Sequence, residues 1–152
     1  VRITADCPLI APDVVACLVK AMVEGDGLDY VNNRLPPITY PRGMEMDVMT
    51  FQTLEVAWRE DDRPKWREHV TPYIYNHPDR FEIHTVRNDV DHSQMVWTVD
   101  SPEDLTFVRR IYDYFGQDSF SYQDVVDVLN AHQEWLEINR SIKTRSLPYM
   151  FS

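Results

Sequence analysis

The chain has 152 residues and a formal net charge of −10. This length provides one domain at most, and the acidic balance argues against nucleic-acid binding through a broad basic face, although a bound metal ion could still attract a nucleotide locally. No apolar run approaches the roughly 20 residues of a membrane span, and two cysteines are too few for a disulfide framework, so we expect a cytoplasmic protein without a membrane partner.

The first predicted element is a short strand over residues 1–5, which ends at Asp6. Pro12 and Asp13 then begin a predicted helix with apolar residues at helical spacing, namely Val14, Val15, Leu18, Val19 and Met22. Cys7 is either a nucleophile or a buried structural thiol. The structural interpretation is favoured because no histidine lies near it in the sequence.

Further strands are predicted over residues 28–32 and 44–48, on either side of a proline-rich loop. Alternation in the second strand places Glu45 and Asp47 on one face and the two methionines with Val48 on the other. From this pattern alone, a half-exposed edge strand without a binding role is as good an interpretation as a strand that lines a site.

A helix is predicted after Thr50, with Phe51, Leu54, Ala57 and Trp58 facing inward. The charged stretch over residues 60–65 predicts a solvated loop. Glu68 and His69 precede Thr71-Pro72, the predicted start of another helix, where exposed backbone N–H groups attract anions. A lone histidine is more often a surface or core residue, so the pattern alone gives His69 no role.

The next predicted strands cover residues 81–87 and 97–99, and the second of them ends at Asp100. Ser101-Pro102 is a strong helix start, with serine as N-cap and proline at the first helical position. The apolar residues that follow at helical spacing are Leu105, Val108, Ile111, Tyr112 and Phe115.

Two more helices are predicted, one after Ser121 and one over residues 132–138. Residues 1–138 form the predicted domain and residues 139–152 a tail. The tail is either mobile or a dimer contact, since its aromatic side chains are costly to leave in water.

Asp6 and Asp100 share one context, because each follows a predicted strand and precedes a helix that begins with proline. In open α/β sheets the carboxyl ends of strands form the ligand site. Two neighbouring carboxylates repel each other and need a counter-cation, for which hard oxygen ligands favour Mg²⁺. The alternative is that both acids only cap helices and balance their dipoles.

Four blocks, in the same order, resemble sugar cytidylyltransferases of the spore-coat polysaccharide biosynthesis protein F type. Acylneuraminate and 3-deoxy-manno-octulosonate cytidylyltransferases are more distantly similar. The blocks are Arg2-Ile3-Thr4-Ala5-Asp6-Cys7-Pro8-Leu9-Ile10, Tyr40-Pro41-Arg42-Gly43-Met44-Glu45-Met46-Asp47-Val48, Arg67-Glu68-His69-Val70-Thr71-Pro72-Tyr73-Ile74-Tyr75 and Trp97 to Leu105.

The resemblance implies a nucleotide-diphospho-sugar transferase fold, an α/β fold with a mixed, mostly parallel sheet flanked by helices. It also implies Mg²⁺-dependent transfer of a cytidylyl group from CTP to a sugar or sugar acid, with release of pyrophosphate, for surface polysaccharide biosynthesis. Asp6 and Asp100 fall on the family's catalytic metal positions. Tyr40, Glu45, Glu68 and His69 are implied to bind the sugar.

The chain departs from this family in two respects. The family's N-terminal nucleotide-binding part, with its basic glycine-containing phosphate loop, has no counterpart here, and Val96 stands where relatives carry an arginine. We therefore expect a C-terminal portion whose first strand is covered by a partner chain, as in a homo-oligomer, or by rearranged pairing.

Two alternatives remain. The first is a truncated, non-catalytic homologue that acts as a binding or assembly module. The second is a glycosyltransferase, whose usual Asp-x-Asp motif is matched by Asp89-Val90-Asp91 in a polar loop.

Overall fold

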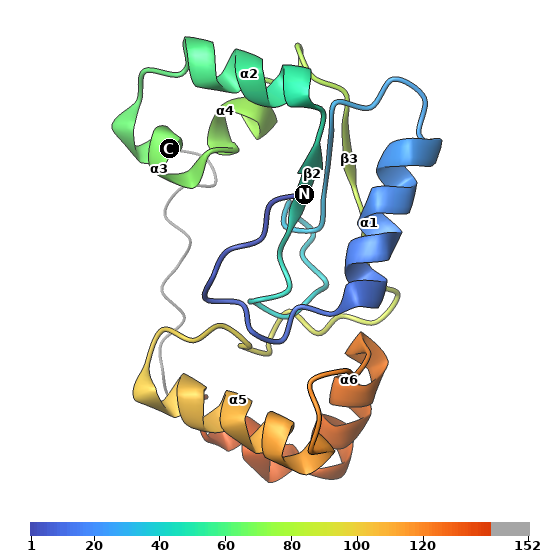
Figure 1. Cartoon of the computed structure of the whole chain (residues 1–152), viewed down its shortest axis with the longest axis vertical. Helices are drawn as coiled ribbons and strands as arrows, with labels where there is room; N and C mark the ends of the chain where they lie inside the picture. The colour runs from blue at the N-terminus through green and yellow to red at the C-terminus, as the bar shows by residue number, and fades with distance from the viewer. Residues whose placement is uncertain (141–152) are drawn as a thin grey trace.

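The computed structural model describes residues 1–140 and contains a small mixed sheet between two groups of helices (Figure 1). The strands are β1 (Tyr30–Asn32), β2 (Asp47–Met49) and β3 (Ile83–Thr85), in the order β2-β1-β3. β1 pairs with β2 antiparallel and with β3 parallel. The α/β class and the mixed sheet are confirmed.

The expected predominance of parallel strands is wrong for this sheet, because each pairing type occurs once. The connections explain why. Residues 33–46 link β1 to β2 without a helix, which allows antiparallel pairing. The parallel pair β1–β3 needs a longer crossover, and α2 to α4 supply it.

The larger core lies between the sheet, α1 and the C-terminal helices. α1 (Pro12–Glu24) runs beside the sheet, and α5 (Pro102–Phe115) and α6 (Tyr122–Ala131) close one end of the molecule (Figure 1). Completely buried side chains from these elements and from the segment before α5 meet here, including Leu18, Val31, Trp97, Phe107, Ile111 and Leu129. The predicted start residues are confirmed: Pro12 begins α1, and Ser101 and Ser121 cap α5 and α6.

A smaller core lies at the other end of the sheet, under α2 (Phe51–Glu60), α3 (Pro64–His69) and α4 (Pro72–Tyr75) (Figure 1). Its buried residues are Tyr30, Ala57, Trp66, Tyr73, Ile74 and Phe81. α3 begins inside the predicted solvated loop. Pro64 occupies its first turn, and the Arg63 guanidinium lies 3.0 Å from the centre of the Trp66 ring.

Some predicted elements are wrong in form. Residues 1–5 and 97–99 are not strands. In the first segment a single residue is paired, Arg2 with Asp47, and beside the second the single pairing is that of Val96 with Arg42. The last helix is a 3₁₀ helix, η1 (Gln133–Glu137). The proposed tail contact falls on residues 141–152, outside the described residues, whereas Asn139 is buried in the fold.

Within residues 1–140, the helices are too short or too polar to cross a membrane.

Candidate functional site

The fold brings the segments that carry Asp6 and Asp100 together, although they are distant in the sequence. The backbone N–H of Val99 donates to the carbonyl of Asp6 at 2.9 Å, so the two segments lie side by side. Both aspartates are exposed, and 48% of the Asp100 side chain is accessible to solvent. The structure therefore presents both side chains to solvent at neighbouring positions.

A buried carboxylate fixes the position of Asp100. Asp104 accepts hydrogen bonds from the Asp100 backbone N–H at 3.1 Å and from the Ser101 hydroxyl at 2.8 Å. The Asn139 side-chain amide donates to its other oxygen at 3.0 Å. Sequence reasoning missed Asp104, although the Ser-x-x-Asp spacing of a capping box at residues 101–104 could have found it.

Arg42 supplies positive charge to the acid pair. Its Nη2 lies 3.1 Å from Oδ2 of Asp100, which also accepts from the Thr98 hydroxyl at 3.3 Å. Arg42 is held in place by its backbone, since its N–H donates to Met95 at 3.0 Å and its carbonyl accepts from Trp97 at 2.6 Å. Sequence reasoning assigned Arg42 only to a turn.

The environment of Asp6 favours its ionised form. Partial burial alone would raise the pKa of Asp6, but hydrogen bonds from Thr4, Cys7 and the backbone, together with the positive charge of Arg42, outweigh it. The pKa of Asp6 is therefore below its ordinary value, and Asp6 is a carboxylate at neutral pH.

Cys7 is a buried thiol that donates to Asp6. Its Sγ lies 3.6 Å from Oδ1 of Asp6 and 3.1 Å from the Thr4 hydroxyl. Burial, together with the negative charges of Asp6 and Glu45, raises the pKa of Cys7 to about 12. At neutral pH Cys7 is protonated, which supports the structural interpretation over the nucleophilic one.

Glu45 lies in the same turn as Arg42. Its Oε2 accepts from the Gly43 N–H at 2.5 Å, and its side chain is half-buried. The Asn33 side chain holds the flanking backbone by bonding to Met44 O and Met46 N, each at 2.8 Å. Hydrogen bonds thus hold the backbone on both sides of Glu45, and its negative charge is felt at Cys7, next to Asp6.

Asp47, expected on the same face as Glu45, is completely buried and has a structural role. It accepts from Arg2 Nη1 at 2.9 Å, from Arg34 Nη1 at 3.4 Å and from the Tyr30 hydroxyl. Burial, followed by the negative charge of Asp47, raises the pKa of Tyr30 well above its ordinary value. This cluster ties the first residues of the chain to β1 and β2.

The remaining predicted residues lie elsewhere. Tyr40 is buried, and its ring packs edge-on against Tyr122 with 5.5 Å between the centroids. Glu68 is exposed and His69 half-buried in the last turn of α3, within the other helical group. The structure therefore groups Asp6, Asp100, Glu45 and Arg42. The metal-binding roles of the two aspartates and the sugar-binding roles of Glu45, Tyr40, Glu68 and His69 stay predictions.

The candidate donors for the predicted magnesium ion are two carboxylates, Asp6 and Asp100. Among residues 1–140, no group of three or more histidine, cysteine and acidic side chains is placed to hold a metal ion. Mg²⁺ does not require such a cage, because it commonly binds one or two carboxylates and completes its shell with water and substrate phosphates. Asp6 and Asp100 can provide that pair.

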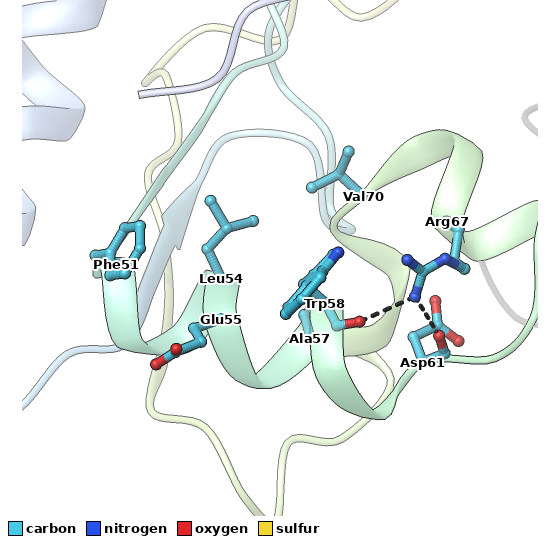
Figure 2. A pocket seen from close by; sticks show the side chains of 8 residues that line it. All are labelled: Phe51, Leu54, Glu55, Ala57, Trp58, Asp61, Arg67 and Val70. Atoms are coloured by element: carbon cyan, nitrogen blue, oxygen red, sulfur yellow. Dashed lines mark hydrogen bonds between the residues drawn. The ribbon is translucent and has the colours of Figure 1, made fainter.

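A separate apolar cavity of about 550 Å³ lies on α2 and the end of α3 (Figure 2). Phe51 and Trp58 line it and are 79% and 65% exposed, so the prediction that they face inward is wrong. The buried residues of α2 are Thr53 and Ala57, and Ala57 also lines the cavity. None of the six predicted site residues lines this cavity.

Comparisons with known proteins identify cytidylyltransferase-like relatives. No family model matches the chain. It is 26% identical over 148 residues to the uncharacterized protein MJ1063 of Methanocaldococcus jannaschii, covering 96% of this chain and 59% of that protein. It is 23% identical over 142 residues to the spore coat polysaccharide biosynthesis protein SpsF of Bacillus subtilis, covering 88% and 55%.

The solved structure of a cytidylyltransferase from Leptospira borgpetersenii matches the fold with a TM-score of 0.80 and 26% identity, over 86% of this chain and 55% of that one. The chain thus resembles a cytidylyltransferase in both sequence and fold, and it spans little more than half the length of the proteins it matches.

Proposed function

We propose that this chain is part of a Mg²⁺-dependent nucleotidyltransferase that transfers a cytidylyl group from CTP to a sugar or sugar acid and releases pyrophosphate. The observation that carries the proposal is the convergence of Asp6 and Asp100 in a chain that resembles a cytidylyltransferase. The similarity to a spore coat polysaccharide biosynthesis protein supports a product used in surface polysaccharide synthesis.

The reaction calls for charge neutralisation and alignment. CTP and pyrophosphate are polyanions, so in-line attack of a sugar oxygen on the α-phosphorus depends on cations and positioning more than on covalent catalysis. Mg²⁺, when bound, would neutralise charge that develops on the phosphate oxygens.

In this proposal, Asp6 and Asp100 hold the cation as ionised ligands. Asp104 fixes the backbone of Asp100 by accepting its N–H, and the Thr98 hydroxyl donates to the Asp100 carboxylate. Glu45, with Tyr40, Glu68 and His69, binds the hydroxyl or anionic groups of the acceptor.

The test is pyrophosphate release by the full-length protein with CTP and a panel of neutral sugars and sugar acids. Asp100→Asn should lower turnover about a hundredfold or more, because a metal ligand contributes several kcal/mol to the transition state. The matched control is Asp118→Asn, in the exposed loop that follows α5, and it should keep full turnover.

Asp100→Asn should also leave the fold intact, because an exposed ion pair such as Arg42–Asp100 contributes no more than about 1 kcal/mol. Near-normal turnover in this variant would exclude Asp100 as a ligand. Absence of pyrophosphate release with every acceptor would instead favour the non-catalytic binding module.

A further inference from the structure

The position of Arg42 is set by its backbone, independently of its charge. Arg42 pairs in parallel with Val96, between the hydrogen bonds to Met95 and Trp97. The next residue, Gly43, has a φ of +100°, and a Cβ there would lie 2.6 Å from the backbone nitrogen of Thr98. The guanidinium is thereby delivered to the segment that carries Asp100.

Solvent exposure distinguishes this ion pair from the other arginine–aspartate contacts. Asp47 is 0% exposed, and its bonds to Arg2 and Arg34 belong to the core. The Asp100 side chain is 48% exposed and that of Arg42 21% exposed, so solvent and solutes can reach the carboxylate of this pair. The Arg42–Asp100 contact is thus an exchangeable one.

The charges around the acids explain what the contact does. Asp6 and Asp100 lie on neighbouring segments and carry two negative charges. Thr4, Cys7 and Thr98 surround them with neutral donors, whereas Arg42 brings a full positive charge to both. An arginine in this position competes with any cation that binds the same oxygens.

We propose that Arg42 is an exchangeable counter-cation of the Asp6–Asp100 pair, which a divalent cation displaces from Asp100, and that the displaced guanidinium then binds a phosphate oxygen of the nucleotide or pyrophosphate. This inference rests on the proposed metal site. A guanidinium suits the second step because its planar donors match phosphate oxygens.

The first test measures the affinity of the full-length protein for Mn²⁺ by titration calorimetry in the absence of substrate. Arg42→Gln should bind Mn²⁺ about five- to tenfold more tightly than the wild type, as expected for removing one charge about 3 Å from a ligand oxygen in a solvated site. Arg42→Lys keeps the charge and should stay close to the wild type. Arg109→Gln, an exposed arginine on α5, is the control and should change nothing.

The second test is binding of inorganic pyrophosphate at saturating Mn²⁺. Arg42→Gln should weaken it about tenfold, which corresponds to loss of one charge-assisted contact. Unchanged pyrophosphate binding by Arg42→Gln would exclude the proposed contact between Arg42 and a phosphate oxygen.

The outcomes separate the two proposals. Equal Mn²⁺ affinity in the wild type and Arg42→Gln would overturn the role of Arg42 while leaving the metal site in place. Undiminished Mn²⁺ binding by Asp100→Asn, or no binding by the wild type, would overturn the metal site and the role of Arg42 together.

Discussion

Replacement of Gly43 by alanine tests how closely the backbone at Gly43 packs against residues 97–98, which precede Asp100. The new Cβ would lie 2.6 Å from Thr98 N and 2.7 Å from the carbonyl carbon of Trp97, both backbone atoms that cannot rotate away. The φ of +100° adds strain of about 1–2 kcal/mol for a residue with a Cβ. Overpacking typically adds about 1–3 kcal/mol. We therefore expect Gly43→Ala to lower the free energy of unfolding by about 2–5 kcal/mol.

Gly116→Ala is the matched control. Gly116 ends α5 with a φ of +63°, and a Cβ there would meet no heavy atom within 4 Å, so this change should cost only the backbone strain, about 1–2 kcal/mol. Urea denaturation of both variants measures the difference, supported by melting temperatures, which should fall about 2–4 °C per kcal/mol in a chain of this size. Equal destabilisation by the two variants would refute the close contact between Gly43 and residues 97–98.

Two further predictions concern titrating side chains. Iodoacetamide should modify the exposed Cys17 of the native protein and spare Cys7, because Cys7 is buried and burial raises its pKa to about 12. Equal labelling of the two cysteines in a mass spectrum would contradict the burial of Cys7. Hydrogen bonds from Arg80 and then Tyr73 lower the pKa of Glu60 to about 2, so their stabilising effect is complete above the ordinary value of 4.5 and is lost as the pH falls toward 2. Arg80→Gln should return the NMR-measured pKa of Glu60 toward 4.5, and an unchanged titration would exclude this pairing.

Sequence reasoning succeeded where the signal is local. α1, α5 and α6 begin at or next to the predicted proline and serine residues, because capping bonds and helical spacing involve residues only a few positions apart. Ser121 even forms the complete capping box with Asp124. The start of each of these helices can therefore be predicted from a short stretch of sequence.

Strand prediction failed where pairing decides the structure. Residues 1–5 have the composition of a strand, but a strand also needs a partner over several residues, and Arg2 finds one only at Asp47. Asp47 itself looked like a surface residue of an alternating strand. Its burial depends on Arg2 and Arg34, which are distant in sequence from it, so no local pattern could have revealed it.

The candidate site shows the same division between local and distant information. Motif resemblance predicted the two aspartates, and it also predicted a loss of positive charge because Val96 replaces an arginine. The structure pairs Val96 with Arg42, whose guanidinium reaches Asp100 from the adjacent segment. Positive charge is therefore present beside the acids although the expected position lacks it. Because this side chain comes from a different segment, we expect it to approach Asp100 from another direction than an arginine at position 96 would. Substitutions at Arg42, rather than at residue 96, should therefore change the affinity of the site for cations and phosphate.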